Sequence, residues 1–327
     1  MFFKNQRIGK YEIIDTIGTG GFGSVYLARD IMIDKKVAIK VPHKQGENVE
    51  KLLREPRLLA ALNHPNIVSV ITADKLNDVF YIVMEFVNGE SLEQLLRRSG
   101  PPPVTMALNW FMNIADALAY AHSKNILHRD IRPANILLSK EGHLKVADLG
   151  TSRYLEDDQH FASTRIGSPP YMAPEHFQGK ATLQSDIYSL GILMYETLTG
   201  KLPYYDKNPK VLAQMARGGQ AQSLLELDPH IPPELERIVQ RAMHPRLSTR
   251  YGTVRDLMHD LQLRLRPVIS SSQELAHLVD SPPKETKHTM LPRHIPTKEI
   301  SSLFCWNCSR PVQKRTRNCP HCGVSLD

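Results

Sequence analysis

Residues 128–135 read HRDIRPAN, and residues 148–150 read DLG. Together they supply two aspartates and an asparagine at short range, Asp130, Asn135 and Asp148. A positioned carboxylate can accept a hydroxyl proton, and carboxylate and amide oxygens are ligands that suit Mg²⁺. We therefore expect Asp130 to accept a proton, and Asn135 and Asp148 to bind Mg²⁺ at the same metal–phosphate centre.

A glycine-rich segment lies upstream, at residues 17–25 with the sequence IGTGGFGSV. Glycines let backbone amides approach phosphate oxygens without interference from a Cβ atom. The G-x-G-x-x-G pattern alone is weak evidence, because dinucleotide-binding domains and ordinary hairpins also carry it. Here a strand-like run follows instead of a helix, VAIKV at residues 37–41, which argues against a dinucleotide-binding fold. Lys40 in that run needs charged partners, since burying an unpaired ammonium is costly.

The combined pattern resembles the protein-kinase family. The resemblance covers residues 11–265 and includes GSPPYMAPE at residues 167–175 and SDIYSLG at residues 185–191. The DIRPANIL run at residues 130–137, without the A-A-R loop of tyrosine kinases, is similar to bacterial eukaryotic-type Ser/Thr kinases. The resemblance implies an α+β, two-lobed fold with a β-rich N-lobe and a helical C-lobe. It also implies that Arg250 is the buried partner of Glu175.

The resemblance implies that Lys40 binds the α- and β-phosphates and is held by Glu55 on a helix. Pro56 follows Glu55 directly, and proline both removes a helical hydrogen bond and disfavours helical geometry at the preceding residue. We therefore expect the helix to begin near Arg54 or to kink there. The residues expected to act in catalysis are Asp130, Lys40, Glu55, Arg132 and Asn135, with Arg132 in the place of the family's lysine.

The resemblance also implies an ATP site, with adenine between apolar side chains and a hinge that hydrogen-bonds the base through its backbone. Met84 stands at the gatekeeper position before the hinge, residues 85–87. The residues expected to bind the nucleotide are Ile17, Gly18, Thr19, Gly20, Gly21, Phe22, Gly23, Val25, Ala38, Lys40, Met84, Glu85, Val87 and Leu137.

The composition sets broader limits. The chain has 327 residues and a formal net charge of +7, and no apolar run approaches the roughly 18–20 residues that span a bilayer. Its first residues lack the apolar run of a signal peptide, so we expect a cytoplasmic protein without a membrane partner. Residues 264–327 hold ten Lys and Arg against five Asp and Glu. Such a tail can contact acidic proteins or nucleic acid, but the scattered charges favour simple solvation.

Residues 266–303 read as a flexible linker rich in Ser, Pro, Thr and Lys. All four cysteines follow it, in the C-x-x-C pairs Cys305/Cys308 and Cys319/Cys322. Two such pairs can hold one tetrahedral Zn²⁺, which would stabilise a segment too short to bury a core. Disulfides are disfavoured in a cytosolic chain, and redox chemistry would need a thioredoxin-like context. We expect a structural zinc module at residues 304–327 that resembles a zinc ribbon.

These patterns predict ATP- and Mg²⁺-dependent phosphorylation of Ser and Thr in proteins, including autophosphorylation, for which Ser163 and Thr164 are the expected positions. The alternative is a weakly active kinase-like scaffold that binds partners through its linker and zinc module. Pro56 and Arg132 are the two departures that favour this alternative.

Overall fold

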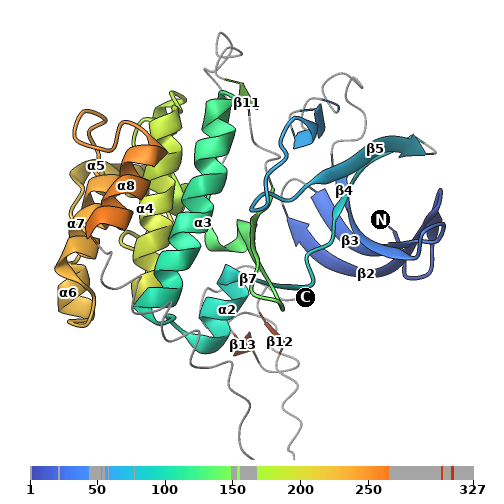
Figure 1. Ribbon diagram of the computed structural model, residues 1–327, viewed down its shortest axis with the longest axis horizontal. Helices are drawn as coiled ribbons and strands as arrows, with labels where there is room; N and C mark the ends of the chain where they lie inside the picture. The colour runs from blue at the N-terminus through green and yellow to red at the C-terminus, as the bar shows by residue number, and fades with distance from the viewer. Residues whose placement is uncertain are drawn as a thin grey trace, which may run out of the picture. The chain divides into compact units, whose positions relative to one another are not determined.

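The computed structural model describes residues 2–20, 23–43, 53, 56–57, 59–76, 78–148, 153–154, 168–264, 303–304 and 311–312. The chain divides into two compact units, residues 1–279 and 280–327. The first unit contains a curled β-sheet and a helical region with separate hydrophobic cores, so the predicted two-lobed fold is confirmed (Figure 1).

The N-lobe is an antiparallel sheet in the order β1-β2-β3-β4-β6-β5. Its strands are β1 (Arg7–Ile8), β2 (Tyr11–Gly20), β3 (Gly23–Asp30), β4 (Lys35–Pro42), β5 (Val70–Leu76) and β6 (Val79–Glu85). Inward-facing side chains such as Ile13, Tyr26 and Ile39 form its core. The glycine-rich segment is the exposed end of the β2–β3 hairpin, where Gly20 pairs with Gly23. Gly21 and Phe22, at its tip, lie outside the described residues.

The C-lobe is built mainly from helices. They are α2 (Leu92–Ser99), α3 (Val104–Ser123), α4 (Leu183–Thr199), α5 (Pro209–Gly218), α6 (Leu224–Leu227), α7 (Pro233–Ala242) and α8 (Val254–Arg264). Short strands join in two small sheets, with β7 (Gly89–Ser91), β9 (Ile136–Ser139) and β10 (Leu144–Val146) in one and β8 (Ile126–Leu127) and β11 (Arg153–Tyr154) in the other. The 3₁₀ helices are η1 (Pro133–Asn135), η4 (Pro169–Tyr171) and η5 (His176–Gln178).

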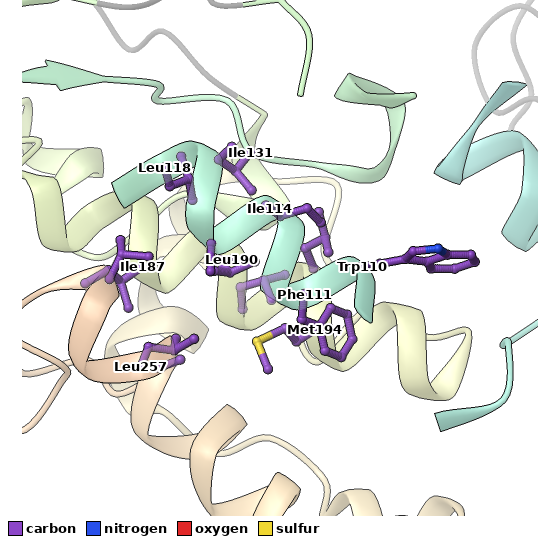
Figure 2. Packing of buried hydrophobic residues seen from close by; sticks show 14 of the residues in the cluster. Trp110, Phe111, Ile114, Leu118, Ile131, Ile187, Leu190, Met194 and Leu257 are labelled. Atoms are coloured by element: carbon purple, nitrogen blue, oxygen red, sulfur yellow. The ribbon is translucent and has the colours of Figure 1, made fainter. Parts of the chain in front are cut away.

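The C-lobe core lies between α3, α4 and α8 (Figure 2). Helix α4 is apolar around most of its circumference and is almost fully buried, as expected for a central helix. A Cβ atom at Gly191 would lie 2.8 Å from Met243 Cγ and 3.0 Å from Ala242 Cβ, so only glycine lets α4 and α7 pack this closely. Ile131, inside the 128–135 segment, joins the same core beside Leu118, which fixes this loop to the lobe.

The helix around Pro56 is described only in part. Leu53 before Pro56 and Arg57 after it are both helical. A start near Arg54 and a kink there both remain predictions, because residues 44–52, 54 and 55 lie outside the described residues. Glu55 itself lies outside the described residues, and its predicted contact with Lys40 remains a prediction.

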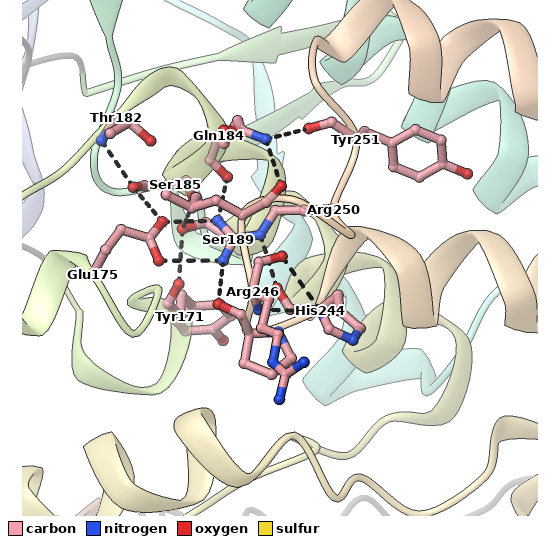
Figure 3. A network of polar contacts seen from close by, with 12 residues as sticks. Tyr171, Glu175, Thr182, Gln184, Ser185, Ser189, His244, Arg246, Arg250 and Tyr251 are labelled. Atoms are coloured by element: carbon pink, nitrogen blue, oxygen red, sulfur yellow. Dashed lines mark hydrogen bonds and ion pairs between the residues drawn. The ribbon is translucent and has the colours of Figure 1, made fainter.

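The predicted ion pair between Glu175 and Arg250 is confirmed (Figure 3). Arg250 NH1 donates to Glu175 Oε1 at 2.8 Å, and NH2 donates to Oε2 at 3.2 Å. The same guanidinium also donates to the carbonyls of Gln184, His244 and Pro245. Arg250 is almost fully buried, so this fork joins the segment before α4 to the segment before α8 inside the lobe.

The second unit contains one described hairpin, β12 (Leu303–Phe304) and β13 (Pro311–Val312), in which Leu303 pairs with Val312. Strand β12 begins at the last residue of the predicted linker. The four predicted zinc ligands lie outside the described residues, as do Ser163 and Thr164. Within the part of the chain that the structure describes, no helix has both the length and the apolar character needed to cross a membrane.

We expect Arg250→Met to lower the free energy of unfolding by about 3–5 kcal/mol, because it leaves the Glu175 carboxylate without its buried counter-charge. Urea unfolding followed by circular dichroism measures this change. The control is Arg237→Met, since Arg237 forms an exposed pair with Glu234 at 2.8 Å and should cost about 1 kcal/mol or less. Equal effects of the two substitutions would contradict the stabilising role of the buried fork.

Candidate active site

The 128–135 loop is held by a buried carboxylate from the core. Asp186, near the start of α4, has no exposed surface. Its Oδ1 accepts a hydrogen bond from the Arg129 backbone N–H at 2.8 Å, and its Oδ2 accepts one from the His128 N–H at 2.9 Å. His122 Nε2 lies 2.8 Å from the same Oδ2. Arg129 adopts a positive φ of 70°, and these contacts compensate for that unfavourable backbone conformation.

Opposing effects act on the pKa of Asp186. Burial raises it, while the hydrogen bond and charge of His122 and the contacts with His128 lower it, and the net shift is downward. The carboxylate therefore stays ionised inside the core, where it can accept all of these hydrogen bonds.

Asp130 is held in place through both carboxylate oxygens. The Ser168 backbone N–H donates to Oδ1 at 3.0 Å, and Asn135 Nδ2 donates to Oδ2 at 2.9 Å. Asn135 Nδ2 also donates to the Asp130 carbonyl at 2.7 Å. Because the amide nitrogen faces Asp130, the Asn135 Oδ1 atom is left to accept a cation. This arrangement fits the predicted Mg²⁺ ligand.

Asp148 follows β10 and meets a lysine from the other lobe. Lys40 Nζ on β4 lies 2.5 Å from Asp148 Oδ1, and only 5% of the Lys40 surface is exposed. Asp148 has a positive φ of 58°, the left-handed conformation that non-glycine residues rarely adopt. This contact brings together two predicted site residues that are 108 positions apart.

His128 connects the loop to the residue before Asp148. The Asp130 N–H donates to His128 Nδ1 at 3.3 Å, so Nδ1 acts as an acceptor and the ring proton belongs on Nε2. Nε2 then donates to the Ala147 carbonyl at 3.2 Å. The Ala147 N–H in turn donates to the Asn135 carbonyl at 2.8 Å. Asp130 and Asn135 therefore belong to one hydrogen-bonded framework that extends to Ala147, the residue directly before Asp148.

Arg132 reaches two segments with its guanidinium. NH1 donates to the Ser168 hydroxyl at 2.8 Å, and NH2 lies 3.6 Å from Glu93 Oε1 on α2. Tyr171, three residues after Ser168, donates from its hydroxyl to Glu196 Oε2 at 2.5 Å. Burial raises the pKa of both Tyr171 and Glu196. Residues 168–171 are therefore anchored beside the Asp130 carboxylate.

A cleft of about 540 Å³ opens next to these groups. Predicted nucleotide-binding residues that line it are Ile17, Gly18, Thr19, Gly20, Gly23, Val25, Ala38, Lys40, Met84, Glu85, Val87 and Leu137, together with Asn135 and Asp148. Phe86 of the predicted hinge also lines the cleft. The sequence interpretation missed other lining residues, namely Leu59, Val68, Gly89, Glu90, Ser91, Gln94, Ala134, Val146 and Ala147. Several of these residues are adjacent in sequence to predicted residues. This adjacency was the one feature of the sequence that could have identified them.

The hinge contains a contact that the sequence analysis did not identify. Glu85 Oε1 accepts hydrogen bonds from the Ser69 N–H at 2.7 Å and from Lys145 Nζ at 2.8 Å. The Glu85 N–H donates to the Ser69 carbonyl at 3.0 Å. The Glu85 carboxylate is thus engaged with protein groups. This observation supports a role for the hinge backbone, not for this side chain, in contacting a base.

The described residues contain no cluster of three or more His, Cys, Asp and Glu side chains suited to a metal. A site formed by Asp148 and Asn135 would complete its Mg²⁺ coordination with water and phosphate oxygens, as Mg²⁺ sites in phosphoryl-transfer enzymes commonly do.

Comparison with known proteins identifies relatives of this chain. Residues 11–261 match the protein kinase domain family. The serine/threonine-protein kinase PrkC of Bacillus subtilis is 36% identical over 268 residues, which is 80% of this chain and 41% of PrkC. The probable serine/threonine-protein kinase PknB of Lactococcus lactis is 36% identical over 77% of this chain and 41% of its own length. PknB of Mycobacterium leprae is 33% identical over 77% of this chain and 42% of its own length. The chain thus spans about two fifths of the length of these curated relatives.

We expect Asp186→Asn to lower the free energy of unfolding at pH 7 by about 2 kcal/mol, because a charged acceptor of several hydrogen bonds is lost. The folded-state pKa of Asp186 lies below the ordinary 3.8, so its contribution is present above that pH and disappears as the pH falls through the folded-state pKa. Urea titrations of both proteins from pH 7 to pH 3 should show the difference shrinking below about pH 4. A difference that is constant across this range would contradict the assignment.

Proposed function

This chain belongs to the protein kinase family, and from that premise we propose that it transfers the γ-phosphate of ATP to Ser and Thr hydroxyls of proteins, its own included. The observation that carries the proposal is the arrangement around Asp130. A fixed carboxylate, a metal-binding amide oxygen and a lysine–aspartate pair meet at one end of a cleft that suits a nucleotide.

Asp130 would receive the proton of the attacking hydroxyl. Its two oxygens are oriented by Asn135 and by the Ser168 N–H, so little reorganisation is needed when the substrate binds. The Arg132 guanidinium, which is always charged, would stabilise negative charge on the transferred phosphoryl group. The hydrogen bond from Arg132 to the Ser168 hydroxyl holds this charge next to the segment expected to bind the substrate.

Lys40 would neutralise the α- and β-phosphates. Because Lys40 is buried, water screens its charge less, and its attraction to the phosphates is stronger. Asn135 and Asp148 would hold Mg²⁺, which supplies charge neutralisation across the phosphates when bound. The apolar residues Val25, Ala38 and Leu137 would enclose the adenine, with the base bonded to the hinge backbone. These side chains from both lobes line one cleft, which supports an active enzyme over the scaffold alternative.

The specificity for Ser and Thr is supported by the printed names of the relatives, each called a serine/threonine-protein kinase. The Ser168 hydroxyl that accepts from Arg132 belongs to the segment whose resemblance to Ser/Thr kinases supports the same specificity. That this chain acts on protein substrates is part of the same proposal.

We expect Asp148→Ala and Lys40→Ala each to reduce phosphoryl transfer by at least about 10²-fold, because each removes a group that acts on the triphosphate. Transfer of labelled phosphate from ATP, to the chain itself and to a Ser/Thr protein substrate, measures the effect. Asp130→Asn should abolish both reactions, since it keeps the shape of the side chain but removes the acceptor.

The control for these variants is Lys75→Ala, which removes the surface ion pair between Lys75 on β5 and Asp78 and should leave the rate unchanged. Circular dichroism should show that all the variants are folded. Wild-type rates in Asp148→Ala would reject the proposed chemistry.

We also propose that Cys305, Cys308, Cys319 and Cys322 hold one structural Zn²⁺. The hairpin of β12 and β13 supports this, because Cys305 directly follows β12 and Cys308 falls within the connection to β13. A C-x-x-C pair between two short strands is a common way to present two thiolates to one metal.

We expect about one zinc per chain by elemental analysis after chelator-free purification, and a large loss of zinc in Cys308→Ser and Cys319→Ser. Kinase activity should survive deletion of the residues after Arg266. A zinc-free wild-type chain would reject the metal site, whereas an inactive deletion would show that the tail is needed for catalysis.

A further inference from the structure

A second cavity lies in the C-lobe, away from the nucleotide cleft. It has a volume of about 370 Å³ and is enclosed by α4, α6, α7 and the end of α5, and it shares no lining residue with the cleft. This volume falls within the range of pockets that bind small ligands, and it corresponds to roughly twelve water molecules at about 30 Å³ each. The catalytic mechanism proposed above does not use it.

One carboxylate is buried in its wall. Glu236 on α7 is 9% exposed, and its Oε1 accepts hydrogen bonds from the Ser223 hydroxyl at 2.6 Å and from the Leu224 N–H at 2.8 Å. Oε2 has no hydrogen-bond partner among the described residues. A role in holding the start of α6 accounts for one oxygen of Glu236, a residue that lines the cavity, and leaves the second oxygen unexplained.

Two tyrosines lie in the same wall. Tyr204 is 3% exposed, and within the described part of the chain its hydroxyl has no hydrogen-bond partner. Tyr195 donates from its hydroxyl to the Gln222 carbonyl at 3.0 Å. Burial raises the pKa of Tyr204 to about 12, and burial together with the charge of Glu236 raises that of Tyr195. Both hydroxyls are therefore neutral near pH 7.

Few charged side chains line the cavity. None of the residues lining it in the described chain is Lys or Arg, and Glu236 is the one acidic residue. His244 also lines the cavity, and its Nδ1 lies 3.1 Å from the Arg246 backbone N–H. A buried carboxylate beside aromatic rings attracts a cation through both ion pairing and cation–π contact.

We propose that this cavity binds the ammonium or guanidinium group of an organic cation, with Glu236 as the counter-charge and Tyr204 as a hydroxyl and ring partner. Such a group can belong to a free amine or to a Lys or Arg side chain of a docked protein. The chemistry at the carboxylate is the same in both cases.

Isothermal titration with agmatine, in the presence of MgADP to occupy the cleft, tests the proposal on the full chain. We expect saturable binding at one site, and no binding of 1-pentanol, an uncharged molecule of similar length. Glu236→Gln retains the Oε1 acceptor but removes the charge, so agmatine should bind at least tenfold more weakly. Tyr204→Phe removes one hydroxyl and should weaken binding about threefold.

The matched control is Glu234→Gln on the same helix, where Glu234 forms a surface pair with Arg237. Agmatine should bind this variant within twofold of the wild type. If Glu236→Gln does not fold, as judged by its unfolding midpoint, Tyr204→Phe carries the test alone.

A second titration distinguishes the sources of the cation. An acetylated and amidated Gly-Arg-Gly peptide that binds as tightly as agmatine would assign the cavity to a side chain of a protein partner. Agmatine binding at least tenfold more tightly than the peptide would assign it to a free amine. Failure of both to bind, or wild-type binding of agmatine by Glu236→Gln or by Tyr204→Phe, would overturn the proposal.

Discussion

The Asp186 carboxylate is the contact on which the geometry of this site most depends. It projects from the most buried helix of the C-lobe and accepts hydrogen bonds from two consecutive backbone amides of the loop that carries Asp130. The second of these amides belongs to Arg129, whose positive φ is an unfavourable conformation for a residue other than glycine. A charge placed in the core thus fixes the backbone, and the backbone in turn places the groups that we propose for chemistry. The stability of the lobe and the position of the proton acceptor are therefore coupled.

A second charged contact links the two lobes. Lys40 belongs to the antiparallel sheet, whereas Asp148 follows β10 of the C-lobe, and their side chains meet at 2.5 Å. A phosphate chain entering the cleft would introduce negative charge beside this pair. Lys40 would then contact phosphate oxygens in place of part of its contact with Asp148. Asp148 would bind a metal ion. The pair keeps both charges compensated until such a substrate arrives.

The sequence predicted the two-lobed fold and the ion pair between Glu175 and Arg250, because both rest on recognisable motifs in register. It also predicted which residues would line the cleft, since glycine-rich and apolar runs mark the strands that carry them. It did not predict the anchoring of Glu85 by Lys145, because this contact joins residues 60 positions apart with no periodic pattern to relate them. The expected start or kink of a helix near Arg54 stays a prediction, because the residues on either side of Leu53 lie outside the described residues. Proline is tolerated in the first turn of a helix, so its presence sets only a weak limit on where a helix begins.

The Glu85 contact also bears on the mechanics of the molecule. Glu85 ends strand β6 of the N-lobe, whereas Lys145 lies on β10 of the C-lobe, and the carboxylate and ammonium hold these strands together at 2.8 Å. A rotation of one lobe against the other changes the distance between most pairs of atoms on the two sides. It leaves this distance unchanged only if the rotation axis passes close by. The ion pair therefore acts as a pivot, and it favours opening and closing of the cleft by rotation over sliding of the lobes past each other.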